Sequence, residues 1–274
     1  MSCPVCNDDG PGRSAAYFNW INVASARAWH MMHNLSAVYP TANYLYVSGN
    51  RGTSVGLFQN AYHQRALRAM GLRASTAFGC AVNYLLFPRP ETLEVIKEEM
   101  DQVLAAPMVF GVQIRTDDKH MAGQDLAESY AAQYRYMFEC AESMERAIGI
   151  LPGGPIAPKW FLVSDSVVVR QQAQIWYPNK TIVYMRSKPR HVSDSATGDM
   201  HGSRLAAAEH WVFGMTDYQV IHWWSGYGRT AAMRAMREMG VHALEAKKDD
   251  CSIENSQDVW QLGDGYSGVR RQGR

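Results

Sequence analysis

A regular alternation of strand-like and helix-like segments, beginning at residue 108, most constrains how this chain can fold. The strand-like segments are 108–114 (MVFGVQI), 159–165 (KWFLVSD), 180–185 (KTIVYM) and 217–223 (DYQVIHW). The segments expected to be helices lie between them or after the last, at 127–148, 166–178, 203–215 and 228–240. Strands alternating with helices predict a parallel sheet with crossover helices. The fold class is therefore α/β, with a Rossmann-like parallel sheet.

The part of the chain before this alternation is less regular. Tyr44 to Val47 reads as a strand, whereas residues 14–35 could be helical. Residues 75–90 (STAFGCAVNYLLFPRP) suggest a buried segment that two prolines end. A boundary near Pro107 gives two domains: a partial N-terminal α/β region, 1–107, and a Rossmann-like domain, 108–274.

Charge and cysteine content exclude several classes of function. The chain has 27 basic and 26 acidic residues, so no global field attracts nucleic acid or an anionic membrane. No run of about 20 apolar residues and no signal-peptide pattern occurs. Cys3 and Cys6 form a lone CxxC without a second ligand pair, which argues against structural zinc. Cys80 and Cys140 stand among apolar residues and are expected in the core.

The first strand-like segment ends in charged residues. Arg115 follows it, and Asp117 and Asp118 come directly after. In open parallel sheets, ligands bind outside the carboxyl ends of the strands, and a guanidinium there can hold two phosphate oxygens. The alternative is an ion pair between Arg115 and one of the two aspartates. These aspartates have no other strong ligands near them, so no metal is expected.

Two more strand ends carry residues that suit an anion or a nucleotide. Ser164, Asp165 and Ser166 come where a helix begins, so they either cap that helix or hold a base or ribose. The strand-like segment 217–223 is followed by a glycine-containing turn and a helix start, where backbone N–H groups can approach a phosphate. Its candidate residues are Ser225, Gly226, Tyr227, Gly228 and Arg229. The turn is neither a P-loop nor a GxGxxG sequence.

A histidine in a polar loop is a further candidate. His201 follows Asp199 before the helix expected at 203–215, and it could reach the same cleft. The alternative is that it is simply solvated.

Together these segments resemble fucosyltransferases of the GT-B type that use GDP-fucose. FGVQIRTDDKH looks like their first motif, which places Arg115 at the β-phosphate of GDP-fucose. Many members have histidine at the position of Gln113, whereas plant xyloglucan-type enzymes have glutamine there, as this chain does. Asp118 with Lys119 resembles the residues that follow the arginine in α1,6-type enzymes. FLVSDS is similar to the second motif, at the nucleotide, and HWWSGYGRTAAM to the third, at the diphosphate.

This resemblance implies an inverting, metal-independent glycosyltransferase that moves fucose from GDP-fucose to a glycan or protein hydroxyl, without a cofactor. Arg115 is the expected catalytic residue. The expected GDP-fucose contacts are Gln113, Asp118, Ser164, Asp165, Ser166, His201, Ser225, Gly226, Tyr227, Gly228 and Arg229. The resemblance also implies the Golgi lumen, although no signal or anchor is visible. The family's acceptor-side domain is larger than residues 1–107, so either a truncated form or a divergent short form is expected. The alternatives are an inactive remnant that binds a nucleotide sugar or glycan, and a transferase that uses another nucleotide sugar.

Overall fold

The computed structural model describes residues 15–19, 26–48, 53–116, 128–151, 153–187, 200–248, 250–258 and 262. The chain divides into two compact units, one formed by 1–77 with 260–274 and the other by 78–259. The boundary predicted near Pro107 stays a prediction.

The first unit contains a parallel pair of strands, β1 (Ala15–Asn19) and β2 (Tyr44–Ser48). Its helices are α1 (Ala26–Met32), α2 (Leu35–Val38), the 3-10 helix η1 (Thr53–Gln59), α3 (Gln64–Ala69) and the start of α4 (Ala74–Leu85). The strand expected at Tyr44 to Val47 is confirmed. The helix expected across residues 14–35 is wrong at its beginning, where β1 pairs with β2. A stretch as short as AAYFN does not distinguish the helical from the strand period, and pairing with a distant segment decides between them.

The second unit is built on a five-stranded parallel sheet in the order β5-β4-β3-β6-β7. The strands are β3 (Val109–Ile114), β4 (Lys159–Ser164), β5 (Thr181–Ile182), β6 (Tyr218–His222) and β7 (Val241–Leu244). If the strands of this unit are numbered 1 to 5 along the chain, their order across the sheet is 3-2-1-4-5, which is the Rossmann arrangement. The α/β class is confirmed. The fifth strand was not predicted, because VHAL is short and is followed by a charged segment.

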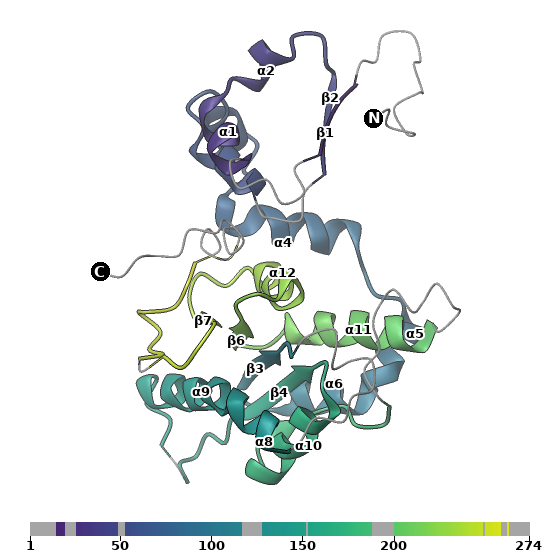
Figure 1. The fold of residues 1–274 in the computed structure, drawn as a ribbon, viewed down its shortest axis with the longest axis vertical. Coiled ribbons are helices and arrows are strands. Elements are labelled where there is room, and N and C mark those ends of the chain that lie inside the picture. The colour runs from purple at the N-terminus through teal and green to yellow at the C-terminus, as the bar shows by residue number, and fades with distance from the viewer. Residues whose placement is uncertain are drawn as a thin grey trace. The chain divides into compact units, whose positions relative to one another are not determined.

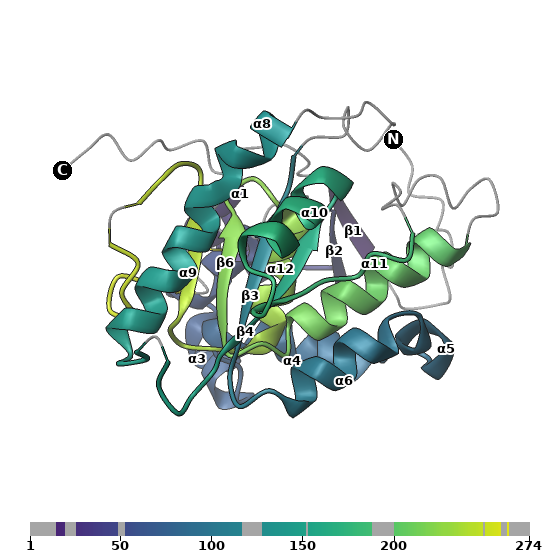
Figure 2. The ribbon, with the colours of Figure 1, turned by 90° about the horizontal axis from the view of Figure 1, so that it is seen from below.

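Helices cover both faces of this sheet. α9 (Arg135–Ala147) and α10 (Val167–Trp176) lie on one face, whereas α11 (Met200–Phe213) and α12 (Gly226–Ala235) lie on the other (Figure 1). Figure 2 views the sheet from the side of α9 and α10. The remaining elements of the unit are α5 (Pro90–Leu93), η2 (Glu94–Ile96), α6 (Lys97–Ala105), α8 (Glu128–Ala131) and η3 (Ala132–Tyr134).

The central strand explains why the sheet must be covered on both sides. All six residues of β3 are buried, as expected for the apolar run VFGVQI in a parallel sheet. Phe110, Val112 and Ile114 pack into one core cluster with Phe138 and Met144 of α9. Because both faces of this strand are covered, we expect a ligand to approach it at its end.

The segment before β3 differs from the prediction. Residues 74–85 form α4 rather than a buried segment, and Tyr84, Leu85 and Phe87 are exposed. Two prolines follow the segment as predicted. Burial was inferred from its many apolar residues, and this inference was wrong for the exposed side chains at its end.

The outer edge of β7 is capped by the segment 251–257. Gln257 donates its backbone N–H to the carbonyl of Val241 at 2.7 Å, and its side-chain amide both donates to and accepts from the backbone of Ala243. A disulfide joins Cys251 to Cys140 of α9. This capping segment therefore occupies the hydrogen-bonding positions that another strand would take.

The cysteine expectations are met in part. Cys140 is buried as expected, but as half of a disulfide, whereas Cys80 is exposed and reduced, so its expected core position is wrong. Cys3 and Cys6 lie outside the described residues.

No helix in the described part of the chain has both the length and the apolar character needed to cross a bilayer.

Candidate functional site

The strand order defines where a ligand site is expected. The chain reverses direction across the sheet between β3 and β6, which are hydrogen-bonded neighbours. Side chains that follow these two strands lie at the topological switch point, where open α/β sheets bind their ligands. Arg115 follows β3, and His222 is the last residue of β6.

Arg115 is held by an aspartate at the end of the neighbouring strand. Its guanidinium nitrogen Nη1 lies 3.1 Å from Oδ2 of Asp165, and 32% of the Arg115 side chain is exposed. The second carboxylate oxygen of Asp165 accepts hydrogen bonds from the backbone N–H and the hydroxyl of Thr116, at 2.8 and 2.9 Å. The ion pair therefore orients the guanidinium, while part of the Arg115 side chain is exposed.

The ion pair considered from the sequence, between Arg115 and Asp117 or Asp118, is not tested, because Asp117, Asp118 and Lys119 lie outside the described residues. The ion pair that the structure describes joins Arg115 to Asp165, 50 residues away. Both carboxylate oxygens of Asp165 face protein groups in this structure. Its contact with a nucleotide stays a prediction.

Gln113 links β3 to β6 and to the start of α12. Its side chain is buried, and its Oε1 accepts a hydrogen bond from the backbone N–H of His222 at 3.3 Å. The same amide packs against Gly228, where an added Cβ would lie 3.0 Å from Cδ of Gln113 and 3.2 Å from Cβ of Ile221. Glycine is required at 228 because the first and third motifs touch there.

Three candidate serines lie in caps and turns. Ser166 accepts from the N–H of Val169 at 3.3 Å and caps α10, and Ser225 accepts from the N–H of Gly228 at 3.1 Å and caps α12. Ser164 accepts from the N–H of Ser166 at 3.2 Å. Each hydroxyl satisfies a backbone donor near the start of a helix, which supports the capping alternative.

The start of α12 presents one open position. A Cβ at Gly226 would meet nothing within 4 Å, so this backbone is accessible. Tyr227 turns its hydroxyl toward α11 and donates to the carbonyl of Ala206 at 2.7 Å. Arg229 is buried, and its Nε lies 3.3 Å from the carbonyl of Ser225. Of the candidates on this turn, the backbone at Gly226 is the one best placed to approach an anion.

His201 contacts a different group of residues. Its Nε2 lies 3.2 Å from the hydroxyls of Tyr184 and Ser187, which follow β5. No contact joins it to Arg115 or His222 among the interactions that the structure describes. Its role in ligand binding stays a prediction.

Beneath the β4–α10 turn lies a buried arginine that the sequence analysis did not identify. Arg170 donates to the carbonyl of Ser164 and the carbonyl of Tyr184, both at 2.8 Å, and to Glu209 of α11 at 3.0 Å. Its side chain is 1% exposed. These contacts fix the turn that carries Asp165, because a buried ion pair with satisfied hydrogen bonds tolerates little displacement.

Two tyrosines and a histidine also meet at this end of the sheet. The hydroxyl of Tyr130 donates to the carbonyl of Thr116 at 3.2 Å and lies 3.1 Å from the hydroxyl of Tyr134. The ring of Tyr134 meets the ring of His222 edge-on, with centroids 6.3 Å apart. The spacing of Tyr130 and Tyr134, one helical turn apart, was the available signal, but nothing in the sequence connected them to β6.

Burial controls the protonation of this group. It raises the pKa of Tyr134 well above its usual value, and the neighbouring Tyr130 adds to the effect. Burial also lowers the pKa of His222, partly opposed by the negative charges of Asp165 and Glu245. At neutral pH, the imidazole of His222 and the phenol of Tyr134 are therefore neutral.

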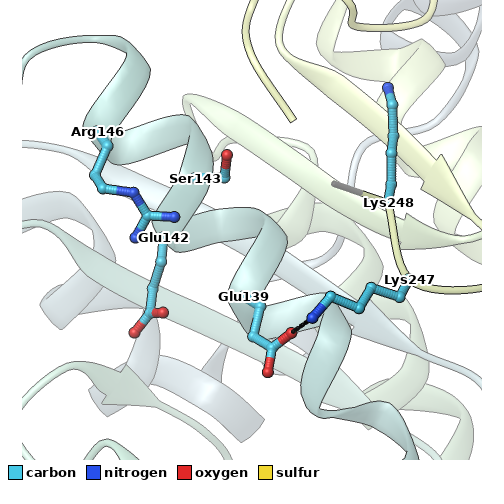
Figure 3. A pocket seen from close by; sticks show the side chains of 6 residues that line it. All are labelled: Glu139, Glu142, Ser143, Arg146, Lys247 and Lys248. Carbon is cyan, nitrogen blue, oxygen red and sulfur yellow. Dashed lines mark ion pairs between the residues drawn. The ribbon is translucent and has the colours of Figure 1, made fainter. Parts of the chain in front are cut away.

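A pocket of about 300 Å³ lies elsewhere, between α9 and the segment after β7 (Figure 3). Its lining carries both signs of charge, and Glu139 pairs with Lys247 at 3.4 Å. The lining residues are Glu139, Glu142, Ser143, Arg146, Lys247 and Lys248. Because it does not include the strand ends, it is not the site that the sequence predicts.

One group of side chains has metal-ligand chemistry among the described residues. Ligand atoms of Cys140, His242 and Cys251 lie within 4.8 Å of one another. Both sulfurs are bonded to each other in the disulfide, and His242 lies 2.9 Å from the carbonyl of Ser252 and 3.1 Å from the amine of Lys248. The two sulfurs and both ring nitrogens of His242 are therefore already engaged in contacts within the protein.

The fold and the site define a Rossmann-like α/β protein with an arginine at the switch point of its sheet. Solved structures with similar folds include a mutant of Arabidopsis thaliana FUT1, a fucosyltransferase, in complex with GDP, at a TM-score of 0.59 and 14% identity. The match covers 88% of this chain and 52% of that one. A second is NodZ α-1,6-fucosyltransferase with GDP, at a TM-score of 0.37 and 16% identity, covering 57% of this chain and 44% of that one. The chain thus spans about half the length of the first of these structures.

The chain therefore has a GDP-fucose fucosyltransferase-like fold of the GT-B type, as the resemblance implied. A scan against models of protein families found no match, and a search of curated proteins found none.

Proposed function

We propose that this protein is a glycosyltransferase that takes fucose from GDP-fucose and transfers it, with inversion, to a hydroxyl of a glycan or protein. One observation carries the proposal: Arg115 stands at the switch point of the sheet, and its side chain is partly exposed there. The fold similarity to a fucosyltransferase that was solved with GDP supports the choice of donor.

The proposed roles follow from this placement. The guanidinium of Arg115 forms a fork that can hold two oxygens of a diphosphate, and its positive charge stabilises the negative charge that develops as the sugar leaves. Asp165 keeps the guanidinium oriented through the 3.1 Å ion pair. The accessible backbone at Gly226, at the start of α12, would add hydrogen bonds to the same anion. Metal independence and a location in the Golgi lumen remain part of the proposal.

Substitution of Arg115 tests the catalytic role. Arg115→Ala should lower transfer by about 10²–10³-fold, the effect of removing one donor to a transition-state oxyanion. Arg115→Lys keeps the charge but loses the fork, so we expect an intermediate loss. Arg237→Ala is the matched control, because it removes an exposed arginine whose ion pair with Asp217 is 3.4 Å long. Near-normal transfer by folded Arg115→Ala would rule out the role.

Thermal stabilisation by nucleotides tests the donor. A ligand present at 100 times its Kd stabilises the folded state by about 2.7 kcal/mol. We expect GDP to raise the Tm and UDP or ADP to raise it much less. Selective stabilisation by UDP would indicate another nucleotide sugar. Stabilisation by GDP without transfer to any member of a glycan and peptide panel would indicate a binding protein that lacks catalysis.

A further inference from the structure

The residue that would remove the proton from the acceptor hydroxyl is not evident in the sequence, but the structure offers a candidate. His222 ends β6 beside Arg115, at the switch point. Its backbone N–H donates a hydrogen bond to Oε1 of Gln113 at 3.3 Å. Its ring is in an edge-on contact with the ring of Tyr134. The position of the imidazole is thus set from two elements, β3 and η3.

The ring nitrogens of His222 are unused. Nδ1 is enclosed and has no hydrogen-bond partner, and neither ring nitrogen forms a hydrogen bond with the described residues. Buried polar atoms in proteins are nearly always paired, so an unpaired nitrogen at a ligand site needs an explanation. A neutral imidazole has one N–H donor and one lone pair, and the lone pair is what a general base requires.

The charged and titratable groups around the ring come from four elements. Arg115 follows β3, Asp165 follows β4, Glu245 follows β7, and Tyr134 ends η3. The two carboxylates would stabilise an imidazolium once it forms, whereas Arg115 and burial keep the resting ring neutral. The ring can therefore accept a proton at neutral pH and is compensated when it does.

We propose that His222 is a catalytic residue that accepts the proton of the attacking hydroxyl group. This inference rests on the proposed function. The acceptor oxygen bonds to the anomeric carbon while its proton passes to Nε2 of the imidazole, because Nδ1 is enclosed. The bond between the anomeric carbon and the diphosphate oxygen breaks, and its electron pair leaves with the diphosphate, beside Arg115.

The test compares His222→Gln and His222→Asn with wild type. The two amides are uncharged and place a polar atom near Nε2 or Nδ1, respectively, but neither titrates. GDP release from GDP-fucose in the presence of acceptors is measured between about pH 5 and pH 8, the range in which histidines change charge. Wild-type kcat should fall on the acid side with a single pKa below 6.5. Both variants should lose about 10²–10⁴-fold in kcat and lose this acid limb.

Binding of GDP separates the possible outcomes. Thermal stabilisation by GDP should be unchanged in both variants, because the proton is accepted from the other substrate. His33→Gln in the first unit is the matched control and should behave as wild type. Retention of most activity by either variant, an unchanged acid limb, or loss of GDP stabilisation in both variants would overturn the role of His222. Absence of GDP stabilisation in wild type would instead overturn the proposed function, and this role with it.

Discussion

The disulfide between Cys140 and Cys251 gives a stability prediction whose size follows from the topology. The two cysteines are 111 residues apart in the sequence, and both belong to the second unit. In the chain-entropy model, closing a loop of this length removes about 16 cal/mol/K from the unfolded ensemble, which corresponds to about 4.8 kcal/mol at 25 °C. Typical domains are stable by about 5–15 kcal/mol, so the bond would supply a large share.

The perturbation is the double variant Cys140→Ser with Cys251→Ser, which removes the bond without leaving an unpaired thiol. We expect its free energy of unfolding in urea to be lower than that of the oxidised wild type by about 2–5 kcal/mol. Dithiothreitol should destabilise the wild type by a similar amount and leave the double variant unchanged. Cys80→Ser is the control, since Cys80 is exposed and reduced.

Two results would refute this reasoning. In protein produced in an oxidising compartment, peptide mapping without reduction should recover the fragment with Cys140 linked to the fragment with Cys251. Recovery of both as separate thiol peptides would show that the bond does not form. Equal stability of the wild type with and without dithiothreitol would show that the bond forms but that closing this loop contributes nothing.

Two further predictions concern packing and pH. Gly228→Ala should lower the free energy of unfolding by about 1–3 kcal/mol, because the added Cβ would push against Gln113. Gly226→Ala is the matched control: its Cβ has open space around it, so the variant should be neutral within about 0.5 kcal/mol. Urea unfolding measures both, and equal effects of the two variants would contradict the close contact at Gly228. Burial lowers the pKa of His210 and of His242 to about 4. Since the unfolded state binds these protons near pH 6.5, stability should fall as the pH drops from about 6.5 to about 4 and change no further through these groups below that. NMR titration of the two imidazoles in the folded protein checks this, and values near 6.5 would contradict it.

The sequence predicted the parts of the fold that depend on local pattern. The apolar run from Val109 to Ile114 indicated a strand covered on both faces, and β3 is buried throughout. The polar residues after three strands indicated the site edge, since parallel strands end on the same side of a sheet.

What could not be predicted depends on contacts between distant segments. Asp165 was considered as a helix cap or a nucleotide ligand, and its pairing with Arg115 appears only once the register of β3 and β4 is known. His222 looked like the end of an apolar strand, and its neighbours come from η3 and from the residues that follow β3, β4 and β7. The link from Cys140 to Cys251 likewise leaves no local signal, because an odd number of cysteines permits many pairings.

The capping of β7 by Gln257 has a consequence for assembly. Exposed strand edges pair readily with edges of other molecules, which leads to extended sheets and aggregation. Here the groups that would accept such a partner, the carbonyl of Val241 and the backbone of Ala243, are already bound within the chain. We therefore expect that two copies of this protein do not join their sheets edge to edge through β7.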